Sequence, residues 1–444
     1  MARSTGAEIG LNGVSPAATS EDIPRGRAIW TAAALGLLAF LAYIDRQILG
    51  VLLVPIQRDL HVSDAAMGAL TGTSFAMAYA VAALPMARLA DRVNRRDLLI
   101  GALVLWSAMT AFCGVTATYI QLLLARMGVA AGESAQAPAS MSLLSDLFPP
   151  SRRATAISVL SIGGGMGSTL GALISGALND RFGWHIALLA VAAPGLVLAL
   201  AMWLTITEPP RRHLNAIPVD EKLRSVGACL RHLFGTRTFR SLLPAMVFKD
   251  VATVAWLNWM PTFLIRVHHL TTSQMGMAFG LATGLGAIVS TTSAGLISDR
   301  LARRGARWRM YYCAILAIVG APFVVGALIA ADMRVVTACI LLYSLTAGGL
   351  TGPTNASMVT VARADMRAFT MAVCALVVTV IAAGATPWII GAINDQLAHT
   401  FGREAVRYSL LIMPSSLVVA CLLYMRSSRS IEADEARALG EIGA

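Results

Sequence analysis

The chain has 444 residues, of which 57% are hydrophobic and only 13% are charged, and its mean hydropathy is +0.68. Soluble domains carry about 25% charged residues, so this composition excludes a water-soluble enzyme and a disordered chain. The formal net charge of +11 is explained better by arginine-rich cytoplasmic loops than by nucleic-acid binding, and we expect no nucleic-acid partner.

Twelve apolar runs follow a polar stretch, residues 1–27, which we predict to be a cytoplasmic N-terminal tail. A helix that crosses a bilayer needs about 20 apolar residues, so each run predicts one membrane-spanning helix. The first six runs predict an N-terminal six-helix bundle over 28–206, with helices at 28–55, 65–88, 97–115, 118–141, 153–178 and 184–206. The last six predict a C-terminal six-helix bundle over 241–425, with helices at 241–265, 273–297, 308–330, 333–357, 367–392 and 405–425.

A stretch rich in Pro, Arg and His, residues 207–240, separates the bundles and is a predicted cytoplasmic linker, while 426–444 is a predicted cytoplasmic C-terminal tail. With both termini in the cytoplasm, 26 of the 35 Lys and Arg residues lie on the cytoplasmic side and six on the opposite side. The positive-inside rule therefore favours this orientation.

Three short features repeat between the two halves in the same order. Two have an offset of 215 residues and one an offset of 208: Asp91–Arg96 with Asp299–Arg304, Gly176–Asp180 with Gly391–Asp395, and Pro138 with Pro353. Such internal symmetry is typical of transporters built from two similar halves, with the substrate held between them near the middle of the membrane.

The repeated Asp-Arg-x-x-Arg-Arg loops resemble motif A of the major facilitator superfamily, in which a glycine precedes the aspartate. Gly295 keeps that glycine in the second copy, whereas Ala87 replaces it in the first. Two further segments, Tyr43–Arg46 and Arg126–Glu133, resemble helix signatures of the spinster branch of that superfamily. The resemblance covers about residues 28–425.

The resemblance implies an all-α membrane protein of the major facilitator fold, with twelve transmembrane helices in two pseudo-symmetric six-helix bundles. It implies a monomer in a bacterial inner membrane. Spinster proteins are implied to move lysophospholipids or sphingoid lipids, with the proton gradient in place of a cofactor. We therefore expect an amphiphilic small-molecule substrate and no metal site.

Charged side chains within the predicted spans are the main functional candidates, because each costs at least about 2.5–3.5 kcal/mol in a bilayer. Asp45 and Glu133 are predicted to couple transport to protons, because desolvation and nearby charges shift the pKa of a buried carboxyl group. Arg46 and Arg126 are predicted to bind an anionic substrate group, because a guanidinium binds phosphate or carboxylate bidentately. The alternative is a static ion-pair network that holds the helices together.

Four further residues complete the predicted cavity. Tyr43, which precedes the charged pair of the first helix, and Asn355, a polar residue on an otherwise uncharged tenth helix, are predicted to bind substrate. Lys249 and Asp250 lie near the symmetry position of Asp45 and Arg46, although we expect them close to a helix end. Charges in the first half and an apolar wall in the second would suit an amphiphile, and would also suit many drugs.

The motif-A loops predict a gating function that does not involve substrate contact. Asp91 is expected to lie against the N-terminus of a helix of the other half, where the helix dipole is positive; by resemblance this is the eleventh helix. The arginines are expected to pair with Asp146 or lipid phosphates, in contacts that break when the cytoplasmic side opens. The alternative is that the arginines only fix the orientation of the loops in the membrane and have no gating function. The predicted gating residues are Asp91, Arg92, Arg95, Arg96, Asp146, Asp299 and Arg300.

A glycine-rich face in the fifth span, Gly163 to Gly167 with Gly171 and Gly176, predicts close helix packing at the interface between the halves. The sequence as a whole predicts a spinster-like secondary transporter and not an enzyme. The alternatives are an organic-anion or drug transporter of the same superfamily, and a membrane receptor or passive channel that does not transport actively.

Overall fold

The structure is a computed structural model that describes residues 24–209, 226–363 and 366–440. Within these ranges every regular element is a helix. The first half consists of α1 (Arg25–Leu60), α2 (Asp64–Gly68), the π-helical turn η1 (Ala69–Thr73), α3 (Ser74–Arg92), α4 (Arg95–Cys113), α5 (Tyr119–Glu133), α6 (Gln136–Leu147) and α7 (Pro150–Thr205).

The second half begins with α8 (Val226–Gly235), a short helix inside the predicted linker. It continues with α9 (Arg237–Arg266), α10 (Thr272–Met275), η2 (Gly276–Leu281), α11 (Ala282–Ala302), α12 (Ala306–Ile329), α13 (Met333–Thr360), α14 (Arg367–Val378), η4 (Thr379–Ala385), α15 (Thr386–Phe401), η5 (Gly402–Glu404), α16 (Ala405–Ser409), α17 (Ile412–Ser428) and α18 (Ile431–Gly440).

Among the described residues, eight segments are long and apolar enough to cross a membrane by length and composition alone. Two of them reverse direction. Thr155–Thr205 turns at Gly183, whose φ of 81° favours glycine, and Phe369–Ser428 turns at Gly402–Glu404. The α5–α6 segment and α9 are not among the eight, because the first is interrupted after Glu133 and the second carries Lys249 and Asp250. Each of the twelve predicted runs is mainly helical in the structure, which is consistent with the predicted fold.

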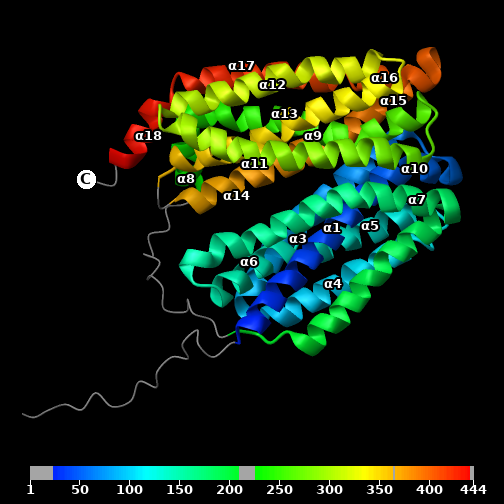
Figure 1. Ribbon diagram of the computed structural model, residues 1–444, viewed down its shortest axis with the longest axis horizontal. Coiled ribbons are helices and arrows are strands. Elements are labelled where there is room, and N and C mark those ends of the chain that lie inside the picture. Colours follow the sequence, from blue (N-terminus) through cyan, green and yellow to red (C-terminus); the bar gives the residue numbers. More distant parts are fainter. Residues whose placement is uncertain (1–23, 210–225, 364–365, 441–444) are drawn as a thin grey trace, which may run out of the picture.

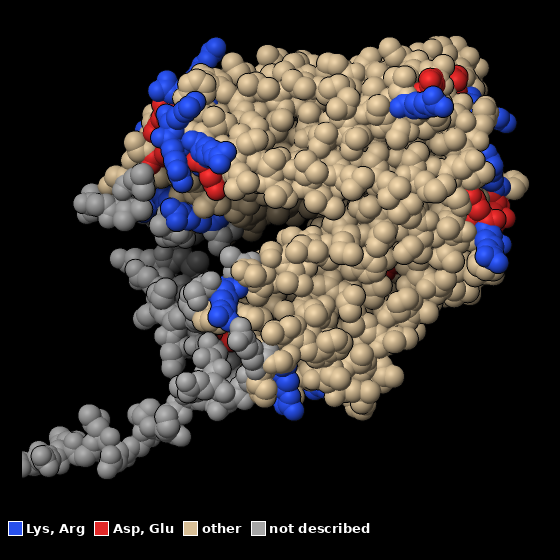
Figure 2. Space-filling view, viewed as in Figure 1, with Lys and Arg blue, Asp and Glu red and all other residues tan. Residues whose placement is uncertain are grey.

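The two halves lie side by side, with α1 and α3–α7 in one group and α9 and α11–α17 in the other (Figure 1). We call the end where α18 and the start of α1 lie the tail end, and the opposite end, with α10 and α16, the closed end. Figure 2 shows a hollow between the halves at the tail end and a continuous surface at the closed end. Charged residues gather at the two ends of this face, and its broad middle is almost free of them.

Each half has its own apolar core, and a third core joins the halves. Trp106 belongs to the core of the first half and Phe239 to that of the second. The third core contains Leu52 and Leu53 of α1 together with Trp259 and Phe263 of α9, all fully buried. Burial of apolar surface therefore holds the halves together at and near the closed end.

The glycine-rich face of α7 packs differently from the prediction. A Cβ on Gly163 or Gly167 would overlap backbone atoms of Gly36 or Phe40 in α1, which lies in the same half. The predicted location between the halves is therefore wrong for these two residues. It is right for Gly176, where a Cβ would overlap the carbonyl oxygen of Thr272 in the other half.

Candidate functional site

The charged residues predicted within the spans of the first half meet in one cluster. Arg46 of α1 donates from Nε to Glu133 Oε2 of α5 at 2.7 Å. The Glu133 side chain is fully buried, whereas the Arg46 side chain is 34% exposed, so the ion pair has a dry end and an accessible end. The second carboxylate oxygen of Glu133 is buried without a hydrogen-bond partner in the described structure.

Asp45 and Arg126 complete this cluster. Asp45 is 3% exposed and accepts a hydrogen bond from the Thr110 hydroxyl of α4 at 2.9 Å. It interacts electrostatically with Arg46, Arg126 and Glu133. Arg126 and Glu133 are seven residues apart on α5, which places them on one face about 10 Å apart along the axis. The structure thus unites the four ionisable residues that sequence analysis selected.

Three aromatic rings surround the accessible end of the cluster. The Arg46 guanidinium carbon lies 5.4 Å from the ring centre of Tyr43, 5.7 Å from that of Phe75 and 5.6 Å from that of Tyr79. The Arg126 carbon lies 4.6 Å from the Phe75 ring centre. Such cation–π contacts hold a guanidinium in place without neutralising its charge. Tyr43 was among the predicted site residues, but Phe75 and Tyr79 of α3 were not, because their i, i+4 spacing is equally compatible with a lipid-facing position.

The second half carries its own buried ion pair. Lys249 is 4% exposed and donates to Asp250 Oδ1 at 2.6 Å and to the Thr351 hydroxyl at 3.1 Å. The pair lies near the middle of α9 and not close to a helix end, contrary to expectation. The second half is therefore not a purely apolar wall. Asn355 is half-buried on α13, one turn after Thr351, and in the described structure no hydrogen bond joins it to the first-half cluster.

The motif-A residues lie at the tail end. Arg95 is 1% exposed and donates to Asp146, to Glu208 Oε1 at 2.7 Å and to the Ser142 hydroxyl at 2.9 Å. Asp146 and Ser142 belong to the first half, and Glu208 lies just after the end of its last helix, α7. Glu208 was not among the predicted site residues. The remaining predicted members lie on the surface or near it: Arg96 donates to the Trp203 carbonyl, and Asp91, Arg92, Asp299 and Arg300 are exposed at the ends of α3 and α11.

The repeated Gly-x-x-Asn-Asp segments join the two halves at the closed end. Asp180 of α7 accepts from the backbone N–H groups of Thr272 at 3.2 Å and Ser273 at 2.8 Å, at the start of α10. Asp395 of α15 accepts from those of Asp64 and Ala65 at the start of α2, both at 2.9 Å. Each carboxylate thus satisfies free N–H groups at the start of a helix in the other half. We call these two contacts the closed-end clamps.

A bidentate ion pair reinforces the clamps. Arg266 of α9 donates from Nη1 and Nη2 to the two carboxylate oxygens of Asp64, both at 2.6 Å, and from Nη2 to Gln57 Oε1 of α1 at 2.5 Å. The Asp64 side chain is only 6% exposed. Charge-assisted bidentate pairs are among the strongest polar contacts in proteins. The repeat that forms the clamps is visible in the sequence, although no function was predicted for it, and Asp64 and Arg266 were not among the predicted site residues.

Comparisons with known proteins agree with this architecture. The model of the Major Facilitator Superfamily matches residues 35–387. An MFS-type efflux pump of Mycolicibacterium smegmatis is 30% identical over 411 residues, covering 91% of this chain and 94% of the pump. A sphingosine-1-phosphate transporter of Danio rerio is 26% identical over 424 residues, covering 89% of this chain and 83% of that protein.

A solved structure supports the same relationship at the level of the fold. The crystal structure of a bacterial homolog of the human lysosomal transporter Spinster, in an inward-facing and unoccupied conformation, matches with a TM-score of 0.83 at 26% identity, covering 93% of this chain and 99% of that one. The predicted fold and the predicted resemblance are thereby confirmed. The chain belongs to the major facilitator superfamily, as a multi-pass membrane transporter related to the spinster proteins and not an enzyme.

Proposed function

We propose that this protein transports an anionic amphiphile by alternating access, with proton coupling through Glu133 and Asp45. The observation that carries the proposal is the Arg46–Glu133 pair, which joins a fully buried carboxylate to a partly exposed guanidinium. The bundles over 28–206 and 241–425 are the two bodies that move. In this proposal the tail end faces the cytoplasm, and the protein works as a monomer in a bacterial inner membrane. The hollow between the halves at the tail end supports an inward-facing state.

The coupling follows from competition for Arg46. While Glu133 is ionised, its carboxylate neutralises Arg46 at 2.7 Å. Protonation of Glu133 removes that charge, and Arg46 becomes available for the anionic head of a substrate. Proton binding and substrate binding therefore favour each other. Asp45 adds a second carboxylate to the same electrostatic cluster, and Arg126 keeps the cluster from becoming net negative.

An apolar groove beside this cluster suits the other end of an amphiphile. The groove has a volume of about 400 Å³ and lies between α7 and α11, one helix from each half. Ile162, Met166 and Ile288 line it, and so does Gln47, the neighbour of Arg46 in sequence. A single hydrocarbon chain in the groove would place a charged head near Arg46. A phosphate head on one chain is also the chemistry of the substrate named for the Danio rerio relative.

A second candidate function is efflux of drug-like amphiphiles. It is favoured by the relative from Mycolicibacterium smegmatis, which is described as an efflux pump. The same aromatic rings around Arg46 would accept flat hydrophobic molecules. The two candidates differ in the charge they require: Arg46 is essential for an anionic lipid and dispensable for a cationic or neutral drug.

The test is uptake into proteoliposomes with and without an imposed proton gradient. Radiolabelled sphingosine-1-phosphate and lysophosphatidylcholine probe the first candidate, and a cationic dye probes the second. We expect Glu133→Gln to abolish gradient-driven accumulation of the phosphate lipid while binding persists. Glu435→Gln on α18 is the matched control and should accumulate normally. Accumulation by Glu133→Gln at the normal level would overturn the coupling proposal.

Proton counting tests the competition directly. In weakly buffered detergent solution, addition of sphingosine-1-phosphate should cause proton uptake by the normal protein, because Glu133 is released from Arg46. The Glu133→Gln variant should bind the lipid without that uptake. Equal proton uptake by both proteins would show that another group carries the proton.

A further inference from the structure

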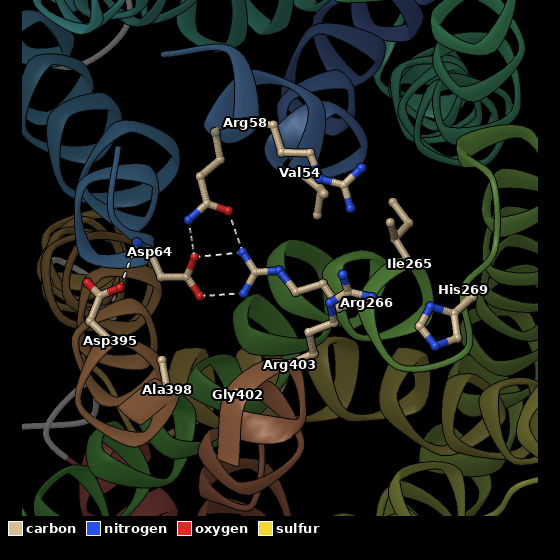
Figure 3. Close-up of a pocket in the computed structure, with 11 residues that line it drawn as sticks. Val54, Arg58, Asp64, Ile265, Arg266, His269, Asp395, Ala398, Gly402 and Arg403 are labelled. Carbon is tan, nitrogen blue, oxygen red and sulfur yellow. Dashed lines mark hydrogen bonds and ion pairs between the residues drawn. The ribbon is translucent and has the colours of Figure 1, made fainter. Parts of the chain in front are cut away.

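A polar cavity lies at the closed end, beside the clamp that Asp395 makes with α2. It has a volume of about 330 Å³, is open to the surface and is lined by residues of both halves (Figure 3). Its ionisable lining comprises Arg58, Asp64, Arg266, His269, Asp395 and Arg403. The cluster around Arg46 contributes no residue to this lining, so this cavity is separate from the proposed transport site.

The acidic residues of this cavity are already engaged. Asp64 binds Arg266 through both carboxylate oxygens, and Asp395 binds two backbone N–H groups of α2. Arg58 and Arg403 are exposed, and neither forms an ion pair or a side-chain hydrogen bond with any described residue. Two guanidinium groups and the His269 ring therefore line the cavity without a partner anion.

Internal symmetry explains why Arg58 has no partner. Arg58 and Arg266 are 208 residues apart, the offset of the Asp91 and Asp299 repeat, and His61 and His269 have the same separation. Both histidines adopt a left-handed backbone, with φ of 53° and 55°. The two arginines thus occupy equivalent positions at the ends of α1 and α9. The residue equivalent to Asp64 is Thr272, so the acid that pairs with Arg266 has no counterpart for Arg58.

We propose that this cavity is an anion-binding site for a phosphate group, held between Arg58 and Arg403 with His269 beside it. Guanidinium groups bind phosphate oxygens bidentately, and three arginines from α1, α9 and the turn after α15 surround the cavity. Arg266 is shared between this site and the ion pair to Asp64. The phosphate comes either from a phospholipid head group of the adjacent leaflet or from free phosphate in solution.

The experiment measures protection of individual arginines from phenylglyoxal, read out by mass spectrometry on the full-length protein. In non-ionic detergent without phospholipid, phosphate is compared with chloride at equal ionic strength. In nanodiscs, phosphatidylglycerol is compared with an uncharged lipid in phosphate-free buffer. We expect modification of Arg58 and Arg403 to slow about tenfold in at least one arm, the equivalent of one charge-assisted contact.

Arg334 is the internal control, because it is an exposed arginine at the same end of the molecule. Protection by phosphate in detergent identifies a free anion as ligand, and protection only with phosphatidylglycerol identifies a lipid head group. Arg58→Gln should remove the protection of Arg403, whereas Arg334→Gln should not. Equal modification rates in all conditions, or equal protection of Arg334, would overturn the proposal.

Discussion

The two ends of the molecule carry the same types of charged side chain, but these side chains contact the other half at one end and their own half at the other. At the closed end, Asp64, Asp180 and Asp395 bind groups of the other half. At the tail end, the ion pairs between described residues stay within one half, as in Arg95 with Asp146 or Arg307 with Glu432. The tail-end pairs therefore stabilise each bundle, and the closed-end contacts stabilise one arrangement of the bundles. Substitutions at the tail end should therefore change the stability of the fold, and substitutions at the closed end should change the equilibrium between conformations.

The largest expected effect is on fold stability at the tail end. Arg95→Gln leaves Asp146, which is 5% exposed, without its cationic partner. Loss of one partner of a buried pair costs about 3–5 kcal/mol. Thermal unfolding in detergent should show a large drop, while spin-label distances across the closed end stay unchanged. Arg92→Gln, an exposed member of the same motif, should change neither quantity. An altered closed-end distance in Arg95→Gln would break the distinction between the ends.

A smaller effect on conformation is expected from the ion pair at the closed end. Arg266→Gln leaves the mostly buried Asp64 carboxylate with Gln57 alone. We expect the state with a joined closed end to be destabilised by about 2–4 kcal/mol relative to the state with a separated closed end. Electron–electron distance measurements between spin labels on α2 and α10 should show a longer population. Arg334→Gln at the same end should retain the short distance; a short distance in both variants would argue against a gating contribution.

Close backbone approach gives a third way to separate the halves. A Cβ on Gly391 would overlap the carbonyl oxygen of Asp64, so Gly391→Ala should cost about 1–3 kcal/mol of closed-end association. Gly101→Ala is the control, because no atom lies within 4 Å of a Cβ there. The same spin-label distances report the outcome. Similar distances in both alanine variants would show that the backbone at the closed end shifts locally to accommodate the Cβ and the halves do not separate.

The smallest expected effect concerns the charge of one clamp. Asp395→Asn keeps an oxygen acceptor for the α2 N–H groups but loses the charge, so we expect a change of about 0.5–1 kcal/mol. Asp332→Asn alters a similar helix-capping carboxylate of α13 within one half. It should lower thermal stability by a similar amount and leave the closed-end distance unchanged. If both variants shift that distance equally, the clamp has no special role.

The fold could be predicted from the sequence because apolar runs and repeated motifs are local signals. Asp45, Arg46, Arg126 and Glu133 could be selected because charges within apolar runs stand out. Phe75 and Tyr79 could not, since aromatic residues on a membrane helix are equally suited to face lipid. The helices α8 and α18 were missed because each has only 10 residues and lies in a stretch predicted as linker or tail.

The closed-end contacts could not be predicted for a different reason. Asp64 and Asp395 are 331 residues apart, and their meeting depends on how the two bundles are placed against each other. No local pattern contains that information. The position of Lys249 in the middle of α9 shows the same limit on a smaller scale, because the edges of an apolar run do not fix where the helix begins.

The closed-end clamps have a consequence for how the two halves can diverge. Their acceptors are side chains, and the donors that both clamps share are main-chain amides, which every residue except proline supplies. The Thr272 hydroxyl adds one side-chain donor to Asp180. The segment that receives Asp395 is Asp64-Ala65, and the equivalent segment that receives Asp180 is Thr272-Ser273. These segments share no side-chain chemistry, yet both serve. The main-chain donors therefore allow different side chains on the receiving side, and in one copy that side chain is Asp64, which also binds Arg266.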